Sequence, residues 1–354
     1  MYMQHPIADA PLPLALAEDV EVALSRLYSA TSLTQEAARA LFAELVGGRL
    51  AEPVIAAMLV ALRLKGETTD ELIGAARALR AADEPFARPD YPFADTCGTG
   101  GDGSGSINVS TAVAFVAAAA GLPVAKHGNR SFTSRCGSAD VLEKLGVRLD
   151  VSAEVSRRAL DETGVCFLFA PRYHPGLRHA GPARRALKVR TIMNVLGPCV
   201  NPAEPGVQLL GVAEPKLLMP VAQTLAALGV VRALVVHGGG LDEIALHAET
   251  QAVRLIDGVL EEVTITPEEA GLVRRPVDSL KGGGPEENAE RLKALLMGYG
   301  QPAETETVAL NTGALLMTAG LAATLRDGVA AALAELASGA PYERLRAFAE
   351  ATNA

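Results

Sequence analysis

Asp95 to Ser138 reads D-T-C-G-T-G-G-D-G-S-G-S-I-N-V-S-T-A-V-A-F-V-A-A-A-A-G-L-P-V-A-K-H-G-N-R-S-F-T-S-R-C-G-S. A glycine has no Cβ atom to hold a ligand away from the backbone, and it adopts left-handed conformations without strain. Successive backbone N–H groups in such a loop can therefore point into one hollow and bind an anion. The glycines of the loop are Gly98, Gly100, Gly101, Gly103 and Gly105. This composition favours a phosphate group as the ligand.

The residues after the loop add further groups that suit an anion. Asn108, Ser110 and Thr111 open an alanine-rich helix that we expect to continue to Ala120, so capping side chains and the positive end of the helix dipole face the same hollow. Residues 122–125 then predict a short strand, with Lys126 and His127 at its carboxyl end. Ligands of open parallel sheets bind at that edge.

A dinucleotide-binding site is the competing interpretation, because residues 98–103 match the pattern G-x-G-x-x-G. That pattern should follow a strongly apolar strand, whereas residues 91–96 are Y-P-F-A-D-T. It also requires an acid at the end of the next strand, where this chain carries Lys126. A plain glycine-rich surface turn would explain the glycines but would leave Asp102 and Lys126 without a reason. We therefore favour a phosphate or pyrophosphate site.

Composition limits the class of protein. The chain has 354 residues, 49% of them hydrophobic, and a formal net charge of −9, which argues against a general nucleic-acid binder. No apolar stretch is long enough to span a membrane, and the first residues do not form a basic region followed by a hydrophobic one. The widely spaced cysteines suggest neither zinc nor a disulfide framework: Cys97, Cys136, Cys166 and Cys199. We expect a reduced, cytoplasmic protein without a membrane or nucleic-acid partner.

Helical periodicity dominates residues 14–82. It predicts helices over 20–27, 32–46, 53–64 and 69–82, with a capping box formed by Ser32 and Gln35 at the second of these. These helices offer few candidate catalytic side chains, so they predict a packing or dimerisation module. Three prolines then mark a domain boundary: Pro85, Pro89 and Pro92.

The remainder of the chain alternates strands and helices. Strands are expected over 147–149, 165–169, 207–212, 233–236, 252–256 and 308–310, and helices over 137–146, 215–228, 286–296, 313–325 and 329–336. A flexible turn is expected at residues 281–284. The pattern predicts an α/β fold with a mainly parallel sheet flanked by helices, plus a small helical domain.

A concentration of positive charge follows the strand at 165–169. Between Thr163 and Ala203 there is no acid, but the segment carries Arg172, Arg178, Arg184, Arg185, Lys188 and Arg190 with His174 and His179. Such a run is often a helix facing solvent or nucleic acid. Because it follows a buried strand and ends at residues 194–198 in what resembles a turn back into a core, we expect it to lie over the phosphate site.

Two adjacent acids form a candidate metal site. Asp242 and Glu243 follow the strand at 233–236 and three glycines, and carboxylate oxygens at the end of a strand can bind a hard cation. Paired acids are also common on surfaces, so this pair alone does not establish a metal.

Taken together, six motifs resemble those of the anthranilate phosphoribosyltransferase family. They occur in the family's order and spacing over nearly the whole chain: Gly98–Asp102, Asn108–Thr111, Lys126–Ser131, Gly137–Asp140, Asn194–Pro198 and Asp242–Glu243. The resemblance implies that anthranilate takes the phosphoribosyl group of 5-phosphoribosyl 1-diphosphate, with release of pyrophosphate, in tryptophan biosynthesis. It implies magnesium, two ions per site, and a homodimer that associates through the helical domain. It also implies that residues 1–88 and 174–200 form this domain, joined by a hinge to an α/β domain of residues 89–173 and 201–354.

The resemblance also implies the roles of individual residues. The sugar diphosphate falls on Gly98, Gly101, Asp102, Ser106, Asn108, Val109, Ser110, Thr111, Lys126, His127, Gly128, Asn129, Arg130, Ser131, Phe132, Thr133, Ser134 and Ser138. Anthranilate falls on Gly98, Asn129, Arg184, His127, Tyr173, His174 and Gly197. Metal binding falls on Ser110, Asp242 and Glu243. Lys126 and Asp102 are expected to act by charge and position, without an acid/base dyad.

Two alternatives stay open at this stage. A pyrimidine nucleoside phosphorylase has a similar fold and a glycine-rich phosphate loop, but its family carries a different segment where this chain has Lys126–Asn129. A non-catalytic relative that binds nucleic acid through the basic segment would have no use for Asp242, Glu243 or Arg184.

Overall fold

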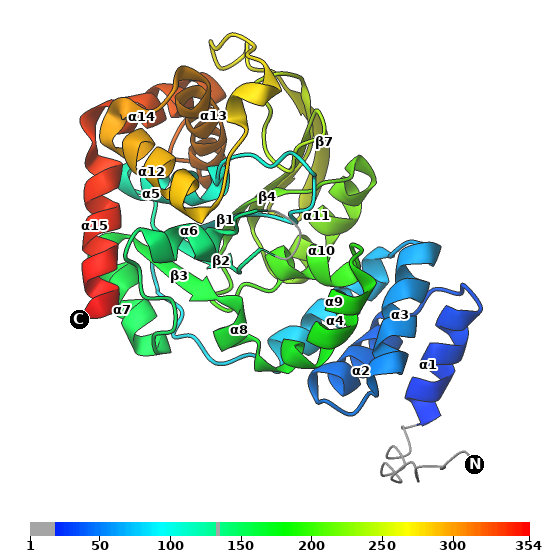
Figure 1. Ribbon diagram of the computed structural model, residues 1–354. Helices are drawn as coiled ribbons and strands as arrows, with labels where there is room; N and C mark the ends of the chain where they lie inside the picture. The colour runs from blue at the N-terminus through cyan, green and yellow to red at the C-terminus, as the bar shows by residue number, and fades with distance from the viewer. Residues whose placement is uncertain (1–17, 132–134) are drawn as a thin grey trace, which may run out of the picture.

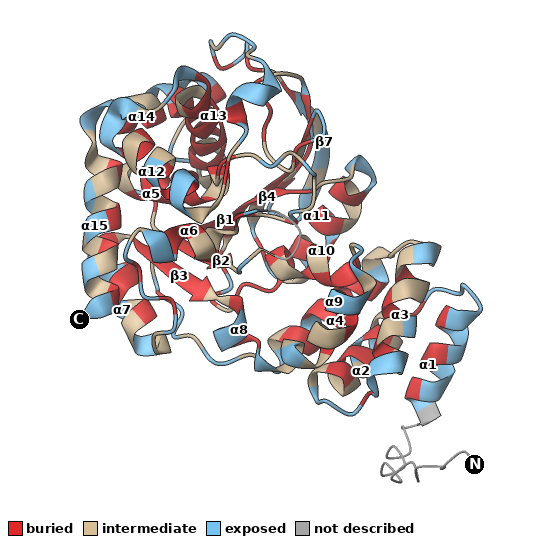
Figure 2. Cartoon of the chain, viewed as in Figure 1, coloured by how far each residue is buried: buried red, intermediate tan, exposed pale blue. Residues whose placement is uncertain are grey.

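The computed structural model describes residues 18–131 and 135–354. A bundle of N-terminal helices lies beside a larger α/β body that holds a single seven-stranded sheet (Figure 1). Buried residues run through the centre of both parts, while exposed residues coat the outer faces of the helices (Figure 2). The predicted fold class is confirmed in both respects. Within the described ranges, no helix combines the length and apolar character needed to cross a membrane.

The N-terminal bundle contains four helices, and its capping differs from the prediction. Thr34, not Ser32, caps the second helix by accepting a hydrogen bond from the backbone N–H of Ala37, and Thr68 forms a capping box with Glu71 at the fourth. The helices are α1 (Glu18–Tyr28), α2 (Gln35–Val46), α3 (Glu52–Lys65) and α4 (Thr69–Arg80).

The sheet has the strand order β3-β2-β1-β4-β5-β6-β7. Its first five members pair in parallel, whereas β6 and β7 extend the sheet as an antiparallel edge. The strands are β1 (Ala94–Gly98), β2 (Val124–Gly128), β3 (Val165–Phe169), β4 (Val207–Gly211), β5 (Arg232–Gly238), β6 (Thr250–Ile256) and β7 (Val259–Ile265). The sequence did not indicate β1 or β7, because β1 is the polar run A-D-T-C-G and β7 is largely exposed.

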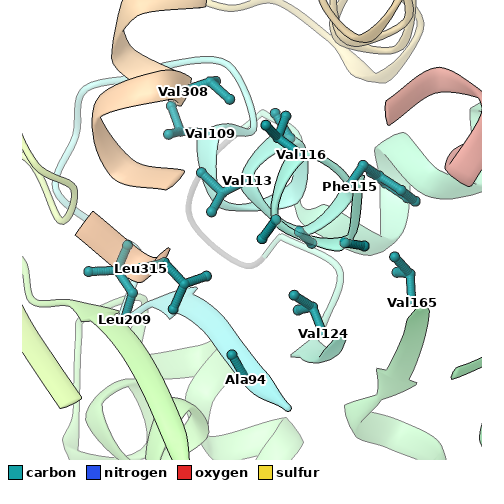
Figure 3. Packing of buried hydrophobic residues seen from close by; sticks show 14 of the residues in the cluster. Ala94, Val109, Val113, Phe115, Val116, Val124, Val165, Leu209, Val308 and Leu315 are labelled. Carbon is teal, nitrogen blue, oxygen red and sulfur yellow. The ribbon is translucent and has the colours of Figure 1, made fainter. Parts of the chain in front are cut away.

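Helix α5 (Val109–Ala119) packs its apolar side chains on one face of this sheet. Val113 and Val116 of α5 belong to one hydrophobic cluster with Ala94 of β1 and Val124 of β2, and Leu315 from a C-terminal helix lies beside Leu209 of β4 (Figure 3). The other helices of the body are α6 (Ser138–Lys144), α7 (Ala153–Thr163), α12 (Pro285–Ala294), a π-helical turn at Leu295–Tyr299, α13 (Pro302–Ala319), α14 (Leu325–Ser338) and α15 (Ala340–Asn353).

Two predicted strands and one predicted turn were wrong. Residues 308–310 lie inside α13, and residues 147–149 form no strand. The helix expected over 313–325 is interrupted at Gly320, whose left-handed conformation ends α13. Residues 194–198, expected as a turn, belong to a helix, α10 (Ile192–Cys199).

The opposite face of the sheet packs against the N-terminal bundle. Successive side chains of a strand point to opposite faces, so Leu209 of β4 joins the cluster around α5 whereas Leu210 joins a second cluster. This second cluster runs without a break from α1–α4 to the sheet. It passes through α9 (Gly181–Leu187), α10 and α11 (Leu218–Ala227).

Candidate active site

A cavity of about 300 Å³ opens at the carboxyl edge of the parallel strands. The glycine loop after β1, the start of α5 and the end of β2 form one wall. Arg184 of α9, together with residues of α10, forms the facing wall, and the Asp242–Glu243 loop after β5 closes one end. The cavity therefore lies between the sheet and the helices that continue into the N-terminal bundle.

The glycine loop has the conformation that its composition predicts. Gly100, Gly101, Gly103 and Gly105 all have positive φ values, from 61° to 79°, which L-residues with a side chain rarely adopt. Asp102 holds the loop from within, because its Oδ1 accepts hydrogen bonds of 3.0 Å from both the backbone N–H and the hydroxyl of Ser104. The loop thus leaves its backbone exposed to the cavity.

Two other glycines allow the Asp242 loop to approach the sheet. A Cβ atom on Gly98 would lie 2.3 Å from Oδ2 of Asp242, and one on Gly211 would lie 1.6 Å from its carbonyl oxygen. The backbone N–H of Gly100 donates a 2.7 Å hydrogen bond to the same Oδ2 atom. The Asp242 carboxylate is therefore fixed directly against the glycine loop.

The acids at this end of the cavity lie close together and are only partly exposed. Burial, and then the neighbouring Asp102 carboxylate, raise the pKa of Asp242 to about 7. Burial and the Asp242 charge likewise raise the pKa of Glu243 well above its usual range. A cation would relieve this repulsion. Mg²⁺ commonly binds through one or two carboxylates plus substrate phosphates.

Lys126 brings a buried positive charge to the floor of the cavity. It lies within β2 instead of after it, and only 3% of its surface is exposed. Its ammonium group donates hydrogen bonds of 2.5 Å to the carbonyl of Thr96 and 3.1 Å to the hydroxyl of Ser110 at the start of α5. These contacts hold the charge beneath the glycine loop.

His127 and His174 both line the cavity and contact each other. Their Nε2 atoms are 3.0 Å apart, and Nδ1 of His127 lies 3.0 Å from the carbonyl oxygen of Gly197 in α10. Burial lowers the pKa of His127 well below its usual range and that of His174 to about 4. Both imidazoles are therefore neutral at physiological pH.

The basic segment divides between the cavity and the surface. Arg184 lines the cavity, and burial lowers its pKa. Arg190 donates a hydrogen bond of 3.2 Å to the carbonyl of Gly101 and pairs with Glu214. Four others are exposed and do not line the cavity: Arg172, Arg178, Arg185 and Lys188. The expectation that the segment lies over the loop thus holds for two of its six cations.

Most of the predicted site residues line this one cavity. They are Gly98, Gly101, Asp102, Ser106, Asn108, Val109, Ser110, Thr111, Lys126, His127, Gly128, Asn129, Arg130, Ser131, Ser138, His174, Arg184, Gly197, Asp242 and Glu243. Phe132, Thr133 and Ser134 lie outside the described residues. Tyr173 is not part of the lining: it is 1% exposed and packs edge-on against Phe86.

Asn288 was not anticipated from the sequence. It comes from α12, and its amide nitrogen donates a 3.0 Å hydrogen bond to the side chain of Asn108. Asn108 makes no side-chain cap to α5, because it joins this bridge and donates to the carbonyl of Cys136. The turn at 281–284, expected to be flexible, is also tied to the loop: Gly282 donates a 2.7 Å hydrogen bond to the carbonyl of Gly105. The sequence offered one hint of the contact between Asn288 and Asn108. Asn288 falls in the first turn of a predicted helix that follows three glycines.

Comparison with known proteins agrees with this architecture. A family model described as the glycosyl transferase family a/b domain matches residues 90–342, and one described as the helical bundle domain of that family matches residues 22–82. The chain is 60% identical over 325 residues to an anthranilate phosphoribosyltransferase of Sorangium cellulosum (strain So ce56), covering 92% of this chain and 93% of that protein.

Solved structures give the same result. The crystal structure of anthranilate phosphoribosyltransferase from Thermus thermophilus has a TM-score of 0.89 and 44% identity, covering 94% of this chain and 99% of that one. The Saccharomyces cerevisiae enzyme in complex with PRPP and Mg shares the fold, with a TM-score of 0.87 at 24% identity over 96% of this chain and 99% of that one. This chain therefore belongs to the anthranilate phosphoribosyltransferases, within the glycosyl transferase family of those two domains.

Proposed function

We propose that this protein transfers the phosphoribosyl group of 5-phosphoribosyl 1-diphosphate to the amine of anthranilate, giving N-(5-phosphoribosyl)anthranilate and pyrophosphate, a step of tryptophan biosynthesis. One observation carries the proposal. A single cavity is lined by a phosphate-type glycine loop, two partly buried acids suited to magnesium and a guanidinium group suited to a carboxylate. These are the groups that a sugar diphosphate and an aromatic acid require together.

The sugar diphosphate occupies the side formed by the glycine loop, the start of α5 and the end of β2. Its phosphates accept hydrogen bonds from loop amides and from the hydroxyls of Ser110 and Thr111 at the helix start. Asp242 and Glu243, with Ser110, hold magnesium, which would shield the charge of the diphosphate as it departs. The PRPP and Mg complex of the yeast enzyme supports this choice of ligand and metal, and two ions per site stays a prediction.

Anthranilate occupies the facing side. The planar fork of Arg184 can donate two parallel hydrogen bonds to its carboxylate, which an ammonium group could not do. Gly98, Asn129, His127, His174 and Gly197 line the remaining space.

This arrangement requires positioning and charge more than proton transfer. When the bond between the anomeric carbon and pyrophosphate breaks, negative charge grows on the leaving group, and Lys126 with the loop amides stabilises it. The aromatic amine is already a free base at neutral pH, so the cavity needs only to hold it against the anomeric carbon.

The decisive experiment follows the fluorescence of anthranilate after the purified protein is mixed with anthranilate, 5-phosphoribosyl 1-diphosphate and magnesium. We expect a decay that requires all three components, and we expect Asp242→Asn with Glu243→Gln to abolish it. A folded protein that gives no decay would overturn the proposal. Phosphorolysis of pyrimidine nucleosides would then be measured next.

We further propose that the protein is a homodimer associating through the helical domain, formed by residues 1–88 and 174–200 and joined by a hinge to the rest. Three exposed apolar side chains support this bundle as the dimer interface: Val22, Tyr28 and Leu64. Leu64→Glu should lower the sedimentation coefficient to that of a monomer, whereas Val259→Glu on β7 should not. An unchanged dimer for Leu64→Glu would exclude the surface around α3. Cytoplasmic location stays a prediction.

A further inference from the structure

A continuous chain of hydrogen bonds connects the end of the N-terminal bundle to the cavity. It begins at Asp83, three residues after α4 ends, whose carboxyl contacts Nδ1 of His174. It continues from Nε2 of His174 to Nε2 of His127 over 3.0 Å, and from Nδ1 of His127 to the Gly197 carbonyl over 3.0 Å. The side chains of Asp83 and His174 are only 9% and 2% exposed, so water does not compete for these bonds.

The Gly197 carbonyl is the last acceptor, and it determines which atom donates in each of the other hydrogen bonds when both histidines are neutral. A carbonyl oxygen can only accept, so Nδ1 of His127 must carry a hydrogen. Nε2 of neutral His127 is then an acceptor, and Nε2 of His174 must donate to it. Nδ1 of neutral His174 is in turn an acceptor, which requires a donor on Asp83. A carboxyl group can donate only when it is protonated.

The surroundings favour this neutral arrangement over an ion pair. Burial raises the pKa of Asp83 to about 8; the Arg80 guanidinium opposes the rise and the more distant Glu204 adds to it. Burial and Arg80 lower the pKa of His174 to about 4. At His127, burial acts first, and the charges of His174 and Lys126 add to it, to lower the pKa. The shared proton therefore resides on the carboxyl.

We propose that Asp83 is a positioning residue of this enzyme: its protonated carboxyl donates to His174, fixes the His127 tautomer with hydrogen on Nδ1, and thereby anchors the Gly197 segment of α10 on the anthranilate side of the cavity. Asp83 itself does not line the cavity. This inference rests on the proposed function only in naming anthranilate as the substrate whose binding is affected. The hydrogen on Nδ1 of His127 follows from its contact with the Gly197 carbonyl alone.

Loss of the Asp83 proton would reverse the chain. With Asp83 ionised, Nδ1 of His174 must donate to it, Nε2 of His174 becomes an acceptor, and Nε2 of His127 must donate. Nδ1 of His127 would then present a lone pair to the Gly197 carbonyl, and that hydrogen bond would be lost. We therefore expect the KM for anthranilate to rise as pH increases through about 8, while the KM for the sugar diphosphate changes little.

Two substitutions at Asp83 and one beside it test the proposal. Asp83→Ala leaves a buried acceptor without its donor, so the KM for anthranilate should rise roughly ten-fold or more. Asp83→Asn supplies a permanent N–H donor of the same shape; it should restore most of the affinity and remove the rise above pH 8. Glu84→Gln removes an exposed acid at the next position and should match the parent protein.

A measurement without turnover separates this proposal from the proposed function. In protein labelled with ¹⁵N-histidine, His127 should show hydrogen on Nδ1 in the parent and in Asp83→Asn, and an altered state in Asp83→Ala; His127→Asn identifies the signal. Hydrogen on Nε2 of His127 in the parent would overturn the proposal. Poor activity of a folded Asp83→Asn, equal to that of Asp83→Ala, would also overturn it, because a carboxylate charge would then be required. Absence of transferase activity in the parent, with the tautomer as stated, would refute the proposed function alone.

Discussion

Gly98→Ala tests whether the Asp242 carboxylate binds magnesium. The new methyl group would lie 2.3 Å from Oδ2 and 2.9 Å from Cγ of Asp242, whereas ordinary contact begins at 3.4 Å. The difference between 3.4 and 2.3 Å means that the carboxylate must retreat by about 1 Å. Gly98 does not have a positive φ, so the backbone tolerates alanine, and the closest contacts of the new methyl group are with Asp242.

The movement of the Asp242 carboxylate determines how large the change in Mg²⁺ affinity should be. It stretches the 2.7 Å hydrogen bond from the N–H of Gly100 beyond hydrogen-bonding distance. A hydrogen bond to a charged group contributes about 1.5 to 3 kcal/mol, which corresponds to roughly 10- to 150-fold in affinity. We therefore expect the Mg²⁺ concentration for half-maximal activity to rise by that factor.

The assay is the initial rate of anthranilate fluorescence loss against Mg²⁺ concentration at fixed substrates. Gly206→Ala is the matched control, because a Cβ atom there meets only Arg88, at 4.0 Å; its Mg²⁺ requirement should not change. An unchanged requirement in folded Gly98→Ala would refute the assignment of Asp242. So would a loss of rate that excess Mg²⁺ does not restore, since the methyl group would then act on a substrate directly.

Three further predictions concern other parts of the site and the bundle. Arg184→Ala should raise the KM for anthranilate at least roughly 30-fold, from about 2 kcal/mol for truncating one charged partner, while exposed Arg185→Ala should not; equal effects on both substrates would remove Arg184 from the anthranilate side. The Mg²⁺ requirement should increase as pH falls below about 7, because Asp242 then gains a proton; a flat profile between pH 6 and 8 would contradict this. Glu71→Ala should lower the free energy of unfolding by about 3 to 5 kcal/mol, because it removes the carboxylate that lies 2.8 Å from the buried ammonium group of Lys65. A urea midpoint within error of the parent would contradict it.

Local chemistry made much of the fold predictable. Amphipathic periodicity located the bundle helices within a few residues, and the glycines of the loop predicted its left-handed backbone. Two of the failures share a cause, which is burial on all sides. Residues 308–310 form a short apolar run that fits a strand or a helix buried on all sides, and α13 is buried in this way. β1 is a central strand despite its polar sequence, because both faces of the sheet are covered around it.

The site was predictable where a backbone requirement or a charge pattern signals it, as with the glycine loop and the pair Asp242–Glu243. The basic segment by itself did not distinguish Arg184 from a surface arginine; only the resemblance to the family did. The site was not predictable where partners come from distant parts of the chain. Asp83 looks like a surface acid in its local sequence, yet it meets His174, 91 positions away.

The order of residues along the chain was enough to predict the class of fold, the left-handed glycine loop and the chemical types of the groups that line the cavity, because backbone conformation and side-chain charge are local properties. Which of these groups meet was settled by the packing in three dimensions. It buried Lys126 beneath the loop, set Asp242 against Gly98, moved Tyr173 out of the cavity wall and joined Asp83 to His127 through His174. Such contacts depend on how the bundle and the sheet pack together, and burial then fixes their protonation.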